Sequence, residues 1–151
     1  MLKFFIILIS LLISSLACST EVSLLCEIKS TYNDSFGDVK KDVGKAIIEV
    51  VDEFPFRMIN ISSEVQGANG IGVATKLPSS MQGKVFDFTT DSKWDIRNLI
   101  EGAEGKMSNR IVIDRFTGLL IVNVDVQTRG MTSQINIGGN CKKIDIGTKK
   151  F

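Results

Sequence analysis

Residues 106–127, KMSNRIVIDRFTGLLIVNVDVQ, decide the fold class of this chain. Polar and apolar residues alternate along 106–114, and turn-forming residues follow at 115–118. The remaining residues separate into an apolar row and a mixed row: Leu120, Val122, Val124 and Val126 against Leu119, Ile121, Asn123 and Asp125. A period of two is typical of a half-buried strand, and two such runs joined by a turn predict a β-hairpin.

Similar runs fill most of the chain on either side of this hairpin. Further strands are expected at 22–32, 45–52, 56–62, 72–76, 84–89, 93–99, 132–137 and 141–146. In 93–99, the side chains of Trp94, Ile96 and Asn98 fall on one face, and Gly138-Gly139-Asn140 is interpreted as a tight turn. We therefore expect an all-β fold, a single small antiparallel barrel or sandwich of about eight short strands.

Residues 38–54 allow a second interpretation. Their apolar positions also fit a helical spacing that would end before Pro55. Gly44 and the β-branched residues around it favour a strand over 45–52. The alternative fold class is α+β, with one helix near 38–54.

The N-terminal segment indicates export. Lys3 is followed by an apolar run over residues 4–13, and small residues precede Cys18. This arrangement is typical of a secretory signal, and the apolar run is short for a membrane span. We expect residues 1–17 to be a signal peptide and 18–151 to form a single β-rich domain, with a retained anchor helix as the alternative.

The sequence allows two mature forms of the exported protein, which differ in whether Cys18 is acylated. Ser15-Leu16-Ala17 suits ordinary signal cleavage, which would release a secreted or periplasmic protein. The same cut would expose Cys18 for acylation, although a lipoprotein box usually carries Leu where Ser15 stands. Acylation would tether the protein to a membrane without a spanning helix.

Three cysteines remain after cleavage, and an oxidising compartment favours pairing of two of them. A Cys26–Cys141 bond would join the first strand to the last and lock the edges where the sheet closes. It would stabilise the fold by about 4 to 5 kcal/mol in the chain-entropy account. Cys18 would then be the odd thiol, available for a lipid; pairing of Cys18 with Cys26 is the alternative.

Composition excludes several function classes. Without Lys3 the basic and acidic residues are equal in number, which argues against binding nucleic acid through phosphates. The chain contains no histidine, so Ser-His-Asp and Cys-His catalysis and imidazole zinc sites are excluded. Asp87, Asp91 and Asp95 recur every four residues but lack the spacing of a calcium loop. We expect no metal and no cofactor.

One resemblance bears on the C-terminal part. The stretch Ile111-Val112-Ile113-Asp114-Arg115-Phe116-Thr117-Gly118, followed about twenty residues later by Gly139-Asn140-Cys141-Lys142, resembles the ending of an uncharacterised group of small exported bacterial proteins. Those proteins carry an Ile-x-Arg-aromatic-Thr-Gly hairpin and a Gly-x-Cys final strand. The group has no assigned activity, so the resemblance implies export and β structure and no catalytic residue.

These observations favour a small exported envelope protein that acts as a non-enzymatic binding or interaction module. Its partner would be an unknown envelope protein or a small ligand. One alternative is a lipocalin-like carrier of a small apolar ligand, with an interior lined by Phe86, Phe88, Trp94 and Met107. The other is a carboxylate-dependent hydrolase, for which no pair of acids stands out.

Overall fold

The computed structural model describes residues 20–144. The expected signal peptide at 1–17, the acylation of Cys18 and the end of the last expected strand lie outside these residues. In the described part, no helix is long and apolar enough to cross a lipid bilayer.

Nine strands make up the described fold, which is all-β. They are β1 (Thr20–Asn33), β2 (Val39–Glu53), β3 (Phe56–Ser63), β4 (Gly72–Ala74), β5 (Gly83–Asp87), β6 (Lys93–Gly102), β7 (Gly105–Asp114), β8 (Leu119–Thr128) and β9 (Met131–Ile144). The expected hairpin is confirmed as β7 and β8, with Gly118 at a positive φ in the turn. Three of the strands are longer than expected, with 14 or 15 residues each.

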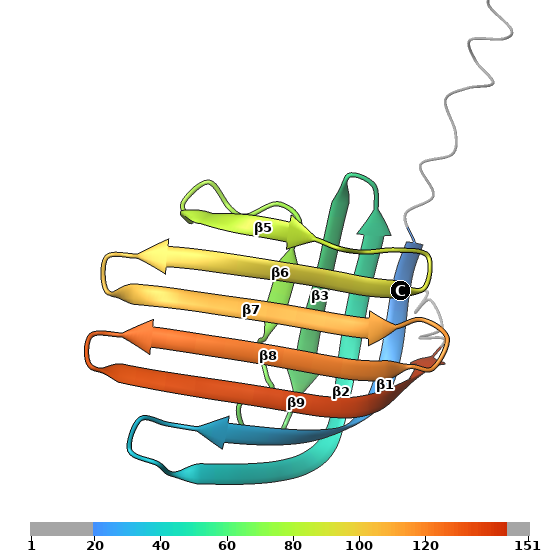
Figure 1. Ribbon diagram of the computed structural model, residues 1–151. Helices are drawn as coiled ribbons and strands as arrows, with labels where there is room; N and C mark the ends of the chain where they lie inside the picture. The colour runs from blue at the N-terminus through green and yellow to red at the C-terminus, as the bar shows by residue number, and fades with distance from the viewer. Residues whose placement is uncertain (1–19, 145–151) are drawn as a thin grey trace, which may run out of the picture.

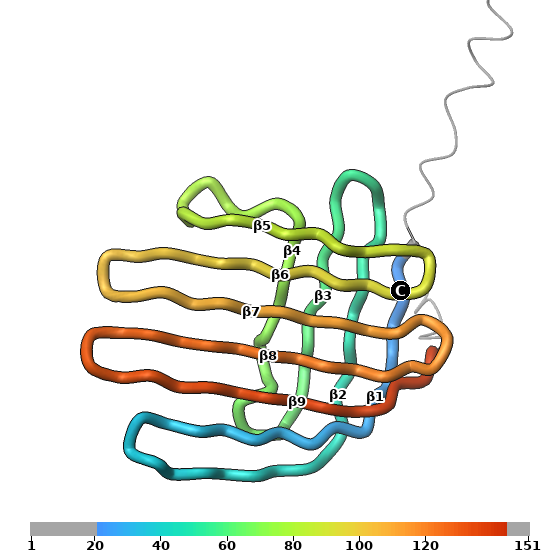
Figure 2. The backbone as a smooth tube through the Cα atoms, in the orientation of Figure 1, coloured from blue at the N-terminus to red at the C-terminus, as the bar shows by residue number. Residues whose placement is uncertain are grey.

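All nine strands belong to one antiparallel sheet in the order β4-β3-β2-β1-β9-β8-β7-β6-β5. The sheet folds over on itself, so that β5 to β9 form one layer and β3 and β4 lie in the other (Figure 1). The long, curved β1 and β2 pass from one layer to the other (Figure 2). The result is a barrel-like sheet that is almost closed.

The helix considered for residues 38–54 is wrong, because this segment is the strand β2. Residues 39–52 pair with β1, and residues 46–53 also pair with β3 on the other side, which satisfies backbone polar groups in the sheet. Ala46, Ile48 and Val50 are buried while the residues between them are exposed, which is the period of a strand.

The tight turn expected at Gly138-Gly139-Asn140 is also wrong, because β9 runs through these residues without a break. Gly139 is needed for close packing of β9 against β1 instead. A Cβ atom on Gly139 would lie 2.5 Å from the carbonyl oxygen of Glu27 and 2.9 Å from the Ile28 side chain. Only glycine therefore fits at this position, where β9 lies very close to β1.

The two layers enclose a core made largely of β-branched side chains. The largest fully buried apolar residues are Ile48, Ile59, Ile61, Ile96, Ile111, Ile113, Leu120 and Ile137. They come from β2, β3 and β6 to β9, and each faces inward at alternate positions. Burial of this shared inner face is the main force holding the layers together.

Cys26 and Cys141 form a disulfide, as the sequence predicts. They are direct register partners on β1 and β9, and they are separated by 115 positions in the chain. The first and last strands are thus neighbours, but the expectation that they form the edges of the sheet is wrong. The edges are β4 and β5, because the chain adds strands outward from β1 and β9 on either side.

Candidate interaction surface

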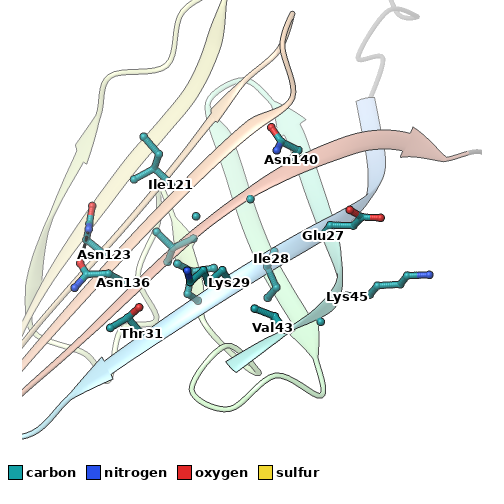
Figure 3. A pocket seen from close by; sticks show the side chains of 15 residues that line it. Glu27, Ile28, Lys29, Thr31, Val43, Lys45, Ile121, Asn123, Asn136 and Asn140 are labelled. Atoms are coloured by element: carbon teal, nitrogen blue, oxygen red, sulfur yellow. Dashed lines mark hydrogen bonds between the residues drawn. The ribbon is translucent and has the colours of Figure 1, made fainter. Parts of the chain in front are cut away.

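The outer face of the sheet carries an open hollow of about 820 Å³ over β1, β2, β8 and β9 (Figure 3). The side chains labelled around it are Glu27, Ile28, Lys29, Thr31, Val43, Lys45, Ile121, Asn123, Asn136 and Asn140. Every one of them projects from a strand rather than from a loop. The hollow is therefore built on paired strands, which position side chains more precisely than loops do.

The missing side chain of Gly138 creates much of the hollow. Gly138 lies between Lys29 of β1 and Ile121 of β8 in the register of the sheet. A Cβ atom added to Gly138 would meet no atom within 4 Å, so the space above it is open. Its register partner Ile121 on β8 is 43% exposed on the same face.

Amide side chains form one wall of the hollow. The Nδ2 group of Asn123 donates a hydrogen bond to Oδ1 of Asn136 at 2.8 Å. An amide has two donor hydrogens and two acceptor lone pairs, so this bond uses only part of each group. The pair is held in place and retains both a donor and an acceptor for a ligand.

The rest of the lining mixes charges with apolar surface. Lys29 and Lys45 contribute ammonium groups, and Glu27 is the one carboxylate among the lining residues. Val43 and Ile121 contribute exposed apolar surface. The hollow thus presents groups of both charges beside apolar surface.

Three aspartates elsewhere in the fold, Asp52, Asp87 and Asp95, are held in ion pairs with arginine or lysine. Arg57 donates to Asp52 through Nε and to Asp87 through Nη1, each at 2.6 Å, and Trp94 donates through Nε1 to Asp52 at 2.9 Å. Burial alone would raise the pKa of Asp52, but the hydrogen bonds from Trp94 and Arg57 hold it below the ordinary value. These acids are therefore ionised acceptors at neutral pH.

Asp95 is bound in the same way on the outer side of β6. Arg110 donates to both of its carboxylate oxygens, at 3.0 and 2.9 Å, and Lys93 adds a third contact at 2.9 Å. Burial would raise the pKa of Asp95, but the bonds from Arg110 and Lys93 outweigh it and lower the pKa. A carboxylate held in this form is a poor proton donor.

The structure separates the four residues considered as a carrier lining. Phe86 and Phe88 stack on each other at 6.3 Å between ring centroids, and both are exposed on the outer face. Trp94 belongs to the core, and Arg115 lies 4.7 Å above its ring. Met107 lies on β7, where it pairs with Val126. These side chains do not line one common cavity.

The three aspartates considered as a calcium site have different surroundings in the structure. Asp87 is paired with Arg57, Asp95 is paired with Arg110 and Lys93, and Asp91 lies in the turn before β6. Among residues 20–144, no group of three acidic, cysteine or histidine side chains is positioned to hold a metal ion.

The comparisons add no relative. No family model, curated protein or solved structure matches the chain. The resemblance of the C-terminal motifs to other exported proteins therefore stays a prediction.

Proposed function

We propose that this protein is a small exported envelope protein that works as a non-enzymatic binding module, and that the hollow above Gly138 receives its partner. The observation that carries the proposal is the composition of that hollow. Fixed amide groups, two ammonium groups and exposed apolar side chains meet on four paired strands around a glycine that leaves the space open. Binding sites combine such apolar area with a few oriented polar groups.

Two further observations support this function. Disulfide bonds such as Cys26–Cys141 form and persist in oxidising compartments. This bond therefore supports export, either to the periplasm or the medium or to a membrane through Cys18. The acids with lowered pKa values, Asp52, Asp87, Asp95 and Asp114, are poor proton donors, which supports binding over hydrolysis.

The test fills the hollow. The chain is immobilised, exposed to soluble envelope extract of its native host, and the retained proteins and small molecules are measured by mass spectrometry. Gly138→Leu projects a side chain into the hollow, and it should abolish retention of the specific partner. Gly138→Ala, which adds only a methyl group, is the matched control and should retain it.

Thermal unfolding of each variant shows that a loss of binding is not a loss of fold. Equal retention by wild type and Gly138→Leu would contradict the proposal. So would turnover of a test substrate that is abolished when Glu27 is replaced by Gln.

A further inference from the structure

The start of β1 lies at one end of the molecule together with two hairpin turns. Thr20 pairs with Asp52, so the β2–β3 turn at Phe54 and Pro55 lies beside the first described residue. β9 ends at this same end, since Ile144 pairs with Ser23, and the β7–β8 turn at Phe116 lies there too (Figure 1).

The Trp94 side chain connects the end of β2, which leads into one turn, with the first residue of the other turn. Its Nε1 donates to Asp52, two residues before Phe54, and its ring is covered by Arg115, the residue before Phe116. The strand end that precedes Phe54 and the residue that precedes Phe116 therefore contact the same buried side chain.

Each of these turns displays a phenylalanine that the core does not use. Phe54 and Phe116 are each 83% exposed. Leaving two large aromatic side chains in water on two turns at this end of β1 is unfavourable by the hydrophobic effect, which favours an apolar partner at this end. Arg115 and Lys143 line a hollow beside Phe116 and could contact lipid phosphates.

The sequence before β1 indicates what covers this end. Cys18 is two residues before Thr20, and two residues of chain span at most about 7 Å. An acyl chain on Cys18 would hold the Thr20 end against the bilayer, and so would a retained apolar segment at residues 4–13.

We propose that the end formed by the start of β1, Phe54 and Phe116 is a membrane-docking face, and that both phenylalanines enter the lipid. Glu21 and Glu53 lie at the same end as Arg115 and Lys143, so net attraction to anionic lipid is small. Apolar insertion is the main contribution, and docking should depend little on the fraction of anionic lipid. In this orientation the sides of the sheet, including the hollow above Gly138, stay accessible.

The test uses the mature chain coupled through the Cys18 thiol to a maleimide lipid, in vesicles of phosphatidylethanolamine and phosphatidylglycerol with brominated acyl chains. Phe54→Trp and Phe116→Trp each add one indole to that of Trp94. Bromines within the acyl region quench only an immersed indole, so tethering alone does not produce the signal. The added emission should be lost in both variants.

Phe36 provides a matched control at the opposite end of β1. It is 81% exposed in the β1–β2 turn, and its tryptophan variant should keep its emission. Unquenched indoles at positions 54 and 116, or equal quenching at position 36, would overturn the proposal.

A second measurement needs no tether. With Cys18→Ser chains, the double change Phe54→Ser and Phe116→Ser should weaken partition into the same vesicles by about tenfold or more, whereas Phe36→Ser should not. Equal partition of the two variants would contradict the docking face. Neither measurement depends on a partner in the hollow, so this inference and the proposed binding function can fail separately.

Discussion

The side-chain amide of Asn98 pairs with both backbone groups of Ala74. The N–H of Ala74 donates to Oδ1 of Asn98 at 2.9 Å, and Nδ2 of Asn98 donates to the carbonyl oxygen of Ala74 at 2.8 Å. Asn98 thus acts as a one-residue substitute for a neighbouring strand along the edge strand β4. Asn109, its register partner on β7, donates to the carbonyl oxygen of Gly72 at 3.4 Å.

These two bonds satisfy buried backbone groups where the folded sheet meets itself. Asn98→Ala would leave the N–H and the carbonyl of Ala74 without partners, and it should reduce the free energy of unfolding by about 2–4 kcal/mol. Urea unfolding measures the change. Asn123→Ala, which removes an amide from the exposed face, should cost about 0.5 kcal/mol or less. Similar costs at both positions would mean that Asn98 does not close the sheet.

The Cys26–Cys141 disulfide should contribute a large part of the free energy of unfolding. Because it closes a loop across 115 positions, replacing Cys26 and Cys141 by alanine should lower the free energy of unfolding by about 4–5 kcal/mol in the chain-entropy account. Peptide mapping without reductant should recover these two cysteines in one linked peptide. A linked Cys18–Cys26 peptide would show that the pairing described here is wrong.

Two adjacent glycines should respond to substitution in opposite ways. Gly138→Leu adds a side chain into open space on a strand, so stability should be unchanged or about 1 kcal/mol higher. Gly139→Ala forces a methyl group against β1 and should cost about 1–3 kcal/mol. Thermal unfolding measures the stability of both variants. Equal changes in stability would show that Gly139 is not the position where β9 approaches β1 closely.

Asp95 should contribute to acid unfolding. Its pKa in the folded protein lies below the value in the unfolded chain, which is about 3.9. The unfolded state therefore binds the proton more tightly, and stability is fully present above that value and lost as the pH falls through the lower folded pKa. Asp95→Asn should flatten this acid limb in urea unfolding measured from neutral pH downward. An unchanged slope would show that Arg110 and Lys93 do not stabilise the carboxylate.

The all-β fold class could be predicted because it depends on the local alternation of polar and apolar residues. The disulfide could be predicted because export to an oxidising compartment favours pairing of cysteines. Alternation along β7 and β8 identified the hairpin, and Asn98 fell on the inner face with Trp94 and Ile96. The strand favoured at 45–52 is confirmed within β2, and the helical alternative at 38–54 arose because the exposed apolar residues Val39 and Val43 completed a helical spacing that burial does not follow.

The hollow could not be predicted, because its residues are brought together by register alone. Lys29, Gly138 and Ile121 are far apart in the chain and meet only through the pairing of β1, β9 and β8. The sequence showed that Ile121 and Asn123 share the mixed outer row, which was the available signal. Adjacent glycines usually form a turn, which predicts one at Gly138 and Gly139, whereas here Gly139 allows β1 to approach closely and Gly138 leaves the outer face open.

The most direct test of a binding hollow is photo-crosslinking in the living native host. A photoreactive residue replaces Asn136 inside the hollow, and in a separate strain it replaces Lys106, which is exposed on β7 away from the hollow. We predict a discrete crosslinked envelope species from position 136 alone, abolished by Gly138→Leu in the same chain. Equal crosslinking from both positions, or a product that persists with Leu at 138, would contradict the account.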